Sequence, residues 1–549
     1  MRKLCILLLL LVQIVSFAQQ KKGYFTGGFE SNMQWYSKDQ NQFDAGFEDY
    51  FRSNNFLKLN YQFQNFNAGI QLESYAPQAL LNYDPKLNKS LDLATYFLKY
   101  QTKYFDFTAG YFYEQFGSGL TLRLWEDRQL GLNNAIRGGR INFTPFKSVS
   151  ITALYGKQRT GFEVTEGNIS ALNLEFGLNE LFEQNAYTLN LGLSYVGRKQ
   201  GWDQITSNAN ETTHAISGRL KFAKAGFYSD LEWVQKSEDA LIELGQIKGD
   251  KIFTGQAMLL NLGYSTFGLG FNASFRRLEN MNFYSDRMDA GNIYNRSIIN
   301  YLPGLTKQHE YSLANIYIYQ TQANLSFNPL PKAGEIGFQI DLFYQIKKGT
   351  ALGGKYGTKL AFNFSKWHGL KAEFDIVNRS YKSEYLAFGE KYFQDFNAEI
   401  QKKWSKNVAS TFTFINSYYS KKDVEETVGK VDFTVVVAES IFKLGSGKAM
   451  KMIAQHLWTR DDKKNWMAAT YEYNFSSRFS VFASDMYNYG NETDTEKKHF
   501  YNFGGNYSKG KVRVSLSYGR QRGGLLCLGG ICRVVPESTG FMLTVNTSF

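Results

Sequence analysis

A dense group of charged side chains between Gly117 and Arg140 is the part of the sequence best suited to a chemical role. The segment reads GSGLTLRLWEDRQLGLNNAIRGGR and breaks the alternation of apolar and polar residues found elsewhere in the chain. Its charged residues are Arg123, Glu126, Asp127, Arg128, Arg137 and Arg140. Such charges can stay hydrated or salt-bridged inside a cavity, where they would narrow it. The alternative is a surface loop with solvated charges, the usual fate of a charge run.

The histidines do not indicate catalysis. His214, His309, His368, His456 and His499 are scattered, and no Ser–His or Asp–His pairing can be picked out from their spacing. No metal-ligand spacing, phosphate loop or nucleic-acid module is present in the sequence. We therefore expect a protein that is not an enzyme, needs no cofactor or metal, and binds no nucleic acid.

The N-terminus has the features of a secretory signal peptide. Arg2 and Lys3 precede an apolar run from Leu4 to Val15, and small residues lead to a cleavage site after Ala18. The run is too short to span a bilayer as a helix, so a retained anchor is the weaker alternative. We expect residues 1–18 to be removed and residues 19–549 to be exported.

Cys527 and Cys532 form the motif CLGGIC and are the only thiols beyond the signal peptide. Two cysteines in an oxidising compartment, separated by four residues with a glycine pair, favour a disulfide that tightens a loop. A metal site would need more ligands than the neighbouring sequence supplies.

The composition favours long, paired β-strands. Aromatic residues make up 16% of the chain, and only 7 of its 549 residues are proline, which cannot donate to a strand ladder. The net charge is +12 and is spread along the chain, which indicates solvated loops and a polar cavity wall. Contact with lipopolysaccharide phosphates is a second interpretation of this basic excess.

Alternation with a period of two indicates strands that face lipid on one side and water on the other. In 187–195 one face carries Tyr187, Leu189, Leu191, Leu193 and Tyr195 and the other carries small polar residues, and 512–518 repeats this pattern. A soluble β-sandwich also alternates, but it offers no interior for so many polar faces. The predicted inward-facing residues of the wall near 359–399 are Lys359, Asn363, Lys371, Glu373, Asp375, Arg379, Asp395 and Glu399.

Turn residues predict the topology of a single large antiparallel transmembrane β-barrel. Short turns alternate with longer polar loops along the chain, which gives about 26 strands with both termini in the periplasm. Boundary errors widen this to roughly 22 to 28 strands. The prediction includes turns near 328–334 and 365–369, loops near 281–307, 347–356 and 384–391, and a strand between 307 and 328. Segments 117–140 and 281–307 are the candidates for folding inward, since a barrel this wide cannot fill its interior with wall side chains.

The last strand carries an assembly signal. Gly540, Leu543, Val545 and the terminal Phe549 follow an order that resembles the β-signal of outer-membrane proteins. We therefore expect the outer-membrane assembly machinery, outer-membrane lipid and lipopolysaccharide among the partners.

Segment 117–140 and the stretch GGLLCLGGICRVVPESTGF before the last strand resemble those of an uncharacterised outer-membrane β-barrel family of Bacteroidota. The resemblance extends over most of the mature chain. It implies the fold and an integral outer-membrane location, and it implies no catalytic residue.

Two functions fit these features. The first is a passive, porin-like channel for small hydrophilic solutes, with weak ion selectivity because the predicted wall carries both signs of charge. The second is a non-transporting scaffold or translocon component that holds a protein partner. Plugged, energised transport is disfavoured because the first predicted strand begins at Gly23, and lipid export is weakened for the same reason.

Overall fold

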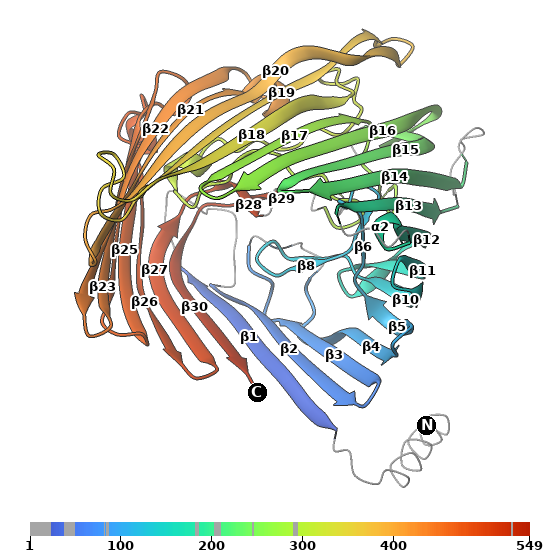
Figure 1. The fold of residues 1–549 in the computed structure, drawn as a ribbon, viewed down its shortest axis with the longest axis horizontal. Helices are drawn as coiled ribbons and strands as arrows, with labels where there is room; N and C mark the ends of the chain where they lie inside the picture. Colours follow the sequence, from blue (N-terminus) through green and yellow to red (C-terminus); the bar gives the residue numbers. More distant parts are fainter. Residues whose placement is uncertain are drawn as a thin grey trace.

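The computed structural model describes residues 23–549 except 38–49, 82, 84–86, 182–185, 202–209, 244–245, 289–291, 293–294 and 529–530. The predicted signal peptide lies outside the described residues. Twenty-four strands form one antiparallel sheet (Figure 1). Among the described residues, no helix has the length and apolar character needed to cross a bilayer.

The first half of the sheet consists of β1 (Tyr24–Tyr36), β2 (Phe51–Phe63), β3 (Phe66–Tyr75), β4 (Asp92–Gln101), β5 (Phe105–Phe112), β10 (Ile136–Phe146), β11 (Val149–Thr160), β12 (Glu163–Gly177), β13 (Thr188–Lys199), β14 (Thr212–Lys224), β15 (Phe227–Glu243) and β16 (Gln246–Thr266). The second half consists of β17 (Leu269–Glu279), β18 (Gly334–Ile346), β19 (Thr358–Asp375), β20 (Ser380–Lys403), β21 (Val408–Ser420), β22 (Lys430–Gly445), β23 (Lys448–Thr459), β24 (Trp466–Asn474), β25 (Phe479–Tyr487), β26 (His499–Lys509), β27 (Val512–Gln521) and β30 (Ser538–Ser548). The short helices are α2 (Leu178–Leu181), α3 (Lys421–Glu425), η2 (Leu313–Asn315) and η3 (Asp494–Glu496).

The sheet closes on itself because the last strand pairs with the first. β30 pairs with β27 on one side and with β1 on the other, in a register that runs from Gly28↔Ser548 to Tyr36↔Gly540. Closure gives every strand two neighbours and removes the unpaired edges of an open sheet. The predicted all-β barrel, with both ends of the chain on one side, is confirmed. We call the side with Tyr24 and Ser548 the terminal end and the opposite side the loop end.

The barrel has 24 strands rather than about 26, and two errors explain the difference. The predicted strand between 307 and 328 lies instead in the connection from β17 to β18, so the predicted turn at 328–334 is also part of that connection. Residues 365–369 and 384–391 are not turns but lie within β19 and β20, which form one long hairpin where three strands were expected. The 347–356 connection consequently lies at the terminal end.

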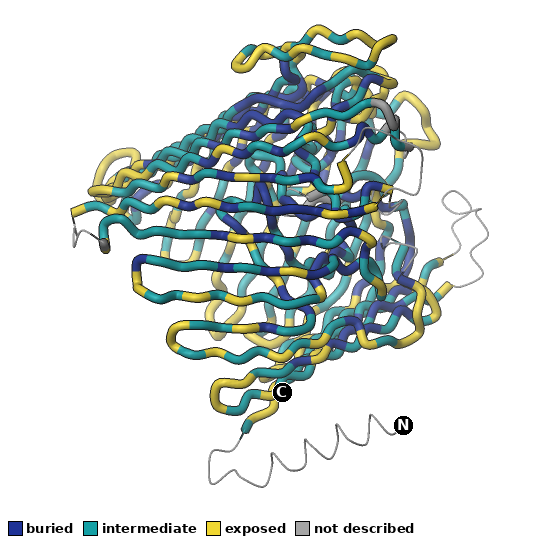
Figure 2. The backbone as a smooth tube through the Cα atoms, turned by 90° about the vertical axis from the view of Figure 1, so that its right-hand side faces the viewer, coloured by how far each residue is buried: buried dark blue, intermediate teal, exposed yellow. Residues whose placement is uncertain are grey.

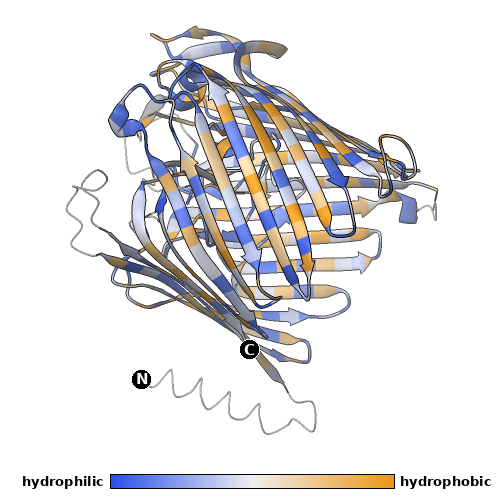
Figure 3. Ribbon diagram, turned by 90° about the vertical axis from the view of Figure 1, so that its left-hand side faces the viewer, coloured by the Kyte–Doolittle hydropathy of each residue, from blue (hydrophilic) through white to orange (hydrophobic). Residues whose placement is uncertain are grey.

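Side chains alternate between the two faces of the wall as predicted. In β19–β21, Phe362, Phe396 and Phe414 face outward with 37%, 40% and 42% of their surface exposed, whereas Asn363 and Asn397 face inward and are buried. Figure 3 shows apolar and polar residues interleaved along the strands of this side of the barrel. The outer surface of the wall is therefore apolar between more polar strand ends.

Candidate functional site in the barrel lumen

Two connections fold into the ring, and together we call them the plug: residues 113–135 and residues 280–333. The first contains β6 (Gln115–Phe116), β7 (Leu122–Arg123), β8 (Glu126–Asp127) and β9 (Leu132–Asn133), and Figure 1 shows β6 and β8 inside the barrel. Main-chain hydrogen bonds join the two segments: the Arg123 N–H donates to Ile299 O at 2.8 Å, and the Tyr301 N–H donates to Gly119 O at 2.8 Å. Of the segments predicted to fold inward, residues 117–135 and 281–307 lie in the plug, whereas residues 136–140 belong to wall strand β10.

The plug packs on the inner wall through apolar side chains. Leu120, Leu122 and Leu124 cluster with wall residues of β11–β17, among them Val196 and Val234. The second plug segment forms a similar cluster with β19–β25. Its members include Leu313, Ile316, Tyr317 and Tyr319 of the plug and Trp367, Val435, Val437 and Trp466 of the wall. Figure 2 shows buried residues concentrated inside the ring and toward the loop end. The plug and the wall therefore share two apolar cores.

Buried ion pairs fix the plug to the wall. Glu335 of β18 binds Arg276 of β17 at 2.6 Å, and it also accepts hydrogen bonds from the Tyr319 hydroxyl and the Gln322 N–H of the plug. Asp239 of β15 binds Arg198 of β13 and Arg287 of the plug at 2.8 and 2.7 Å. A buried carboxylate is tolerated only with such partners, so each pair specifies where the plug sits.

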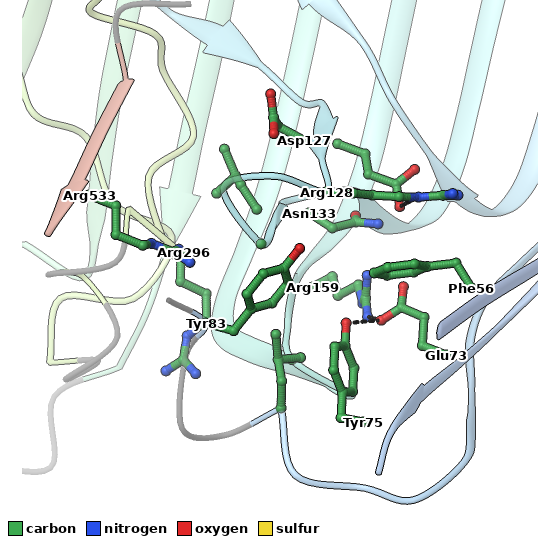
Figure 4. A pocket seen from close by; sticks show the side chains of 15 residues that line it. Phe56, Glu73, Tyr75, Tyr83, Asp127, Arg128, Asn133, Arg159, Arg296 and Arg533 are labelled. Atoms are coloured by element: carbon green, nitrogen blue, oxygen red, sulfur yellow. Dashed lines mark hydrogen bonds and ion pairs between the residues drawn. The ribbon is translucent and has the colours of Figure 1, made fainter. Parts of the chain in front are cut away.

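A small cavity of about 30 Å³ marks the place where the plug meets the connections 76–91 and 522–537 at the loop end. Figure 4 shows Arg159 of β11 and Tyr75 of β3 both bound to the Glu73 carboxylate, with Tyr83, Arg296 and Arg533 across the cavity. The Arg159–Glu73 distance is 2.6 Å and both side chains are almost fully buried. Burial raises the pKa of Tyr83 in this cavity, so its hydroxyl stays protonated.

Five of the six charged residues predicted in 117–140 face the lumen. Arg123 stacks between the rings of Trp125 and Tyr301, at 4.7 and 3.7 Å. Arg128 binds Glu30 of β1 at 2.8 Å and Glu126 at 3.3 Å, and Asp127 accepts hydrogen bonds from the Gln129 and Leu130 N–H groups. Arg140 binds Asp106 of β5 and Glu114 of the plug.

Arg137 is the exception, and its prediction as a lumen residue is wrong. Ile136 next to it is buried in the apolar cluster of the plug, so Arg137 points to the opposite face of β10 and is exposed. Ile141 and Phe143 lie on that same outer face and are 42% and 44% exposed. A local sequence pattern did not show where the plug ends and the strand begins, and one residue of offset reverses the side chain.

The predicted wall residues near 359–399 divide into two groups. Asn363, Asp395 and Glu399 face inward, where Asn363 donates to Asp341, Asp395 accepts from Ser417, and Glu399 lies 3.9 Å from Lys307 of the plug. Lys359 lines the same inner surface near the terminal end, beside a cavity of about 470 Å³ that also contacts Lys307 and Glu399.

The other four, Lys371, Glu373, Asp375 and Arg379, do not line the lumen, which corrects the prediction. They belong to the hairpin arm, which we define as residues 370–391 of β19 and β20 and their turn. The arm extends past the neighbouring strands, because pairing of β18 with β19 ends at Gly369 and pairing of β20 with β21 starts at Phe393. Lys371 and Glu384 form an ion pair with both side chains 59% exposed. The side chains alternate between the two faces as predicted, but this part of β19 and β20 extends beyond the barrel wall.

The inner face of β26, β27, β30 and β1 forms a polar strip. It consists of Asn502, Asn506, Arg513, Ser515, Thr544, Asn546 and Asn32. A cavity of about 660 Å³ lies against its terminal end. Within the described chain, none of these side chains has a hydrogen bond or ion pair to the plug; Thr544, for example, donates to Asn32 at 3.0 Å. The polar strip is thus a part of the lumen wall that the plug leaves uncovered.

The remaining predicted residues lie in the 522–537 connection and on or next to the closing strand. Cys527 and Cys532 face each other in the hairpin of β28 (Gly524–Leu528) and β29 (Ile531–Val535), but the Cys527 side chain is outside the described residues, so the disulfide stays a prediction. Gly540, Leu543, Val545 and Phe549 lie on or directly after the closing strand. No cluster of three His, Cys, Asp or Glu suited to a metal is found where the structure is described.

Sequence reasoning missed the residues that hold the plug, above all Glu73, Asp239 and Glu335. Each is a single carboxylate in an otherwise ordinary strand, and its arginine lies on another strand. The only signal available was an acidic residue among apolar neighbours near a strand end, as with Glu335 before Ile336 and Phe338.

Comparisons with known proteins give one family and a set of distantly similar structures. A family model described as "Family of unknown function (DUF6029)" matches residues 1–549, and no curated protein matches. The solved structures that resemble the chain include the translocation pore of the P pilus usher PapC, at 9% identity and a TM-score of 0.44 over 95% of this chain and 99% of that one. The siderophore receptor PirA from Pseudomonas aeruginosa has 8% identity and a TM-score of 0.44 over 97% and 81%, and OccK5 (OpdH) from Pseudomonas aeruginosa has 10% and 0.36 over 79% and 98%.

Proposed function

The chain belongs to DUF6029, a family of unknown function, and from the geometry of its lumen we propose that it is an integral outer-membrane channel of restricted bore. It passes small hydrophilic solutes without catalysis and without an energy source. The predicted resemblance to an uncharacterised barrel family is confirmed by the family match, and its bacterial lineage stays a prediction.

The connections support an orientation with the terminal end in the periplasm. Most turns at that end are two to four residues long, as at 225–226 and 510–511, although 178–187 and 347–357 are longer. The longest connections, 76–91, 113–135, 280–333 and 522–537, all lie at the loop end. Outer-membrane barrels have short periplasmic turns and longer extracellular loops. The plug then narrows the lumen from the extracellular side.

The observation that carries the proposal is the contrast between the two halves of the inner wall. The plug packs on β11–β17 and β19–β25 through two apolar clusters, while the polar strip has no such contact and borders a cavity of about 660 Å³. The second cavity, beside Lys359 and Glu399, lies at the terminal end below the plug contacts. Solutes would pass between the polar strip and the plug, where the Arg128–Glu30 pair joins the plug to β1. Because this pair is neutral overall, we expect weak ion selectivity.

Excision of the plug tests the proposal. Phe112 pairs directly with Ile136, and Glu279 pairs directly with Gly334, so replacing 113–135 or 280–333 by a short glycine-rich turn leaves the wall in register. In planar bilayers we expect a small unit conductance for the native protein and a several-fold larger one when both segments are replaced. Replacement of the mostly exposed 347–356 connection at the terminal end, which has no hydrogen bond or ion pair to the plug among the described residues, is the control. If the native protein never exceeds the lipid background while the excised variant conducts, the channel is closed and the proposal is wrong.

A second candidate is a scaffold that holds a protein partner, and the hairpin arm favours it. The arm exposes apolar side chains, with Val377 90% and Leu386 60% exposed. Pull-down by the native protein but not by a variant in which residues 371–389 are replaced by a short turn would support this function. Equal recovery of partners by both proteins would count against it.

A further inference from the structure

An outward-facing cluster of basic residues lies at the base of the hairpin arm, on the loop-end side of the apolar wall. Lys366 of β19, Lys391 of β20 and Lys430 of β22 gather around Tyr418 of β21. The Lys391 ammonium lies 3.7 Å from the centre of the Tyr418 ring, and that of Lys430 lies 5.9 Å from it. Lys366 lies in the same outward-facing row of the sheet as Tyr418, because Lys366 pairs with Gln394 and Gln394 pairs with Tyr418. We call these three lysines and Tyr418 the basic cluster.

The register places the basic cluster directly above apolar wall. The outward row nearest to it toward the terminal end contains Phe364 and Phe396, and the row after that contains Phe362 and Phe414. Successive outward rows in a strand are about 7 Å apart. A lipid whose chains cover these phenylalanines would therefore have its headgroup at the level of the lysines.

Two of the three lysines in the basic cluster have no ion-pair partner within the described chain. Lys366 and Lys391 form no ion pair within the described chain, and Lys430 lies 3.7 Å from Asp432 with both side chains more than half exposed. The acidic groups nearest to the cluster are Asp423 and Asp432 beside Tyr418 and Glu390 beside His368. None of these carboxylates forms an ion pair with Lys366 or Lys391 within the described chain, so both ammonium groups are available to an external anion.

The hairpin arm lies along one side of the basic cluster. The His368 ring, which faces outward next to Lys391, bonds to Gly389 O at 2.8 Å and packs edge-on against Phe388 of the arm at 5.2 Å. Farther along the arm, the Tyr385 carbonyl accepts from Arg277 of β17 at 2.6 Å. The base of the arm is thereby held against the outer wall, and the basic cluster lies beside it.

We propose that the basic cluster binds the phosphate of a phosphorylated lipid in the outer leaflet, with its acyl chains on the adjoining phenylalanines. The proposal rests on the membrane orientation of the proposed function but not on conduction. Lysine is a point-charge ligand for phosphate, and a basic residue near a membrane surface strengthens binding of an anionic lipid about fivefold.

Native mass spectrometry of the detergent-solubilised protein tests the proposal, with lipid A that carries two phosphates as the probe. The triple variant Lys366→Gln, Lys391→Gln, Lys430→Gln is expected to bind it at least about tenfold more weakly than the native protein, since three basic groups are lost. The matched control is Lys103→Gln, Lys224→Gln, Lys511→Gln, which removes the same charge from turns and a strand end at the terminal end. This control is expected to bind as the native protein does.

Two further binding measurements distinguish a lipid phosphate from free inorganic phosphate. Lipid A without its phosphates is expected to bind as weakly to the native protein as the intact lipid binds to the triple variant. Inorganic phosphate is expected not to displace the lipid. Equal affinity of the native protein and the triple variant for the intact lipid would overturn the site, as would displacement by inorganic phosphate. Unchanged conductance of the triple variant would leave the channel proposal standing whichever result is found.

Discussion

Charged side chains in the lumen differ in their exposed fraction, and this fraction separates structural ion pairs from those that can border a solute path. Arg159 and Glu73 are almost dry, so removal of one partner would leave a buried charge, at a cost of about 3–5 kcal/mol. Arg128 and Glu30 keep about a quarter of their surface exposed. The first pair is therefore structural, and the second borders the proposed path.

His309 of the plug predicts a response to pH. Burial, helped by the nearby Lys307, lowers the pKa of His309 to about 4. A plug detached from the wall would carry this histidine at its ordinary pKa of about 6.5 and would bind more protons between these values. Docking of the plug is thus fully stable above about pH 6.5 and weakens as the pH falls toward 4. We expect the conductance of the native protein to rise when the pH is lowered from about 7.5 to about 5.

His309→Gln is the matched variant, because it keeps a polar side chain that does not titrate. Its conductance is expected to stay level over the same pH range. An equal rise in both proteins would assign the response to another group.

At the scale of elements, closure of the barrel depends on the β1–β30 seam, and Gly540 is its most constrained residue. A Cβ at this position would lie 1.9 Å from the Trp35 carbonyl oxygen of β1. We therefore expect Gly540→Ala to fold into lipid vesicles more slowly and less completely than the native protein. The gel-mobility difference between folded and heated barrel reports this directly.

Gly218→Ala serves as the control, because Gly218 also lies in a wall strand but has no atom within 4 Å of the added carbon. Equal folding of both variants would show that close approach at the seam does not limit closure.

The sequence predicted elements well where one face of a strand meets lipid. β13 and β27 follow from alternation alone, because their outward leucines and tyrosines recur every second residue. Residues 308–327 were predicted as a strand because they lie between a predicted loop and a predicted turn, yet Tyr317 and Tyr319 pack on the inner wall instead. A local pattern shows that a face is apolar but does not show whether lipid or protein covers it.

The candidate site was predictable only in part for the same reason. The charge density of 117–140 identified the plug segment that carries Arg123 and Arg128, but the carboxylates that hold the plug come from distant strands. Glu335, for example, is bound by Arg276 from a strand that the whole 280–333 segment separates from it in sequence. Such pairs depend on the closed register of the barrel, which no short segment specifies.

On the scale of the whole molecule, the width of the barrel explains the plug. Wall side chains fill a barrel of about eight strands, and a wider one must enclose water, inserted segments or a ligand. This barrel of 24 strands encloses inserted segments and a cavity. The plug fills the lumen beside β11–β25, and the polar strip borders the cavity. The account therefore requires that one face of the wall meets lipid and the other meets the plug.

Tryptophan quenching by brominated lipids measures that requirement most directly. Trp233 of β15 faces outward with 46% of its surface exposed, whereas Trp367 of β19 faces inward, is fully buried and donates to Leu305 O of the plug at 3.0 Å. Two variants, each retaining only one of these tryptophans, would be folded into vesicles whose acyl chains carry bromine. Strong quenching of Trp233 with little quenching of Trp367 is predicted. Equal quenching of the two residues, or none for Trp233, would contradict a lipid-facing barrel with an internal plug.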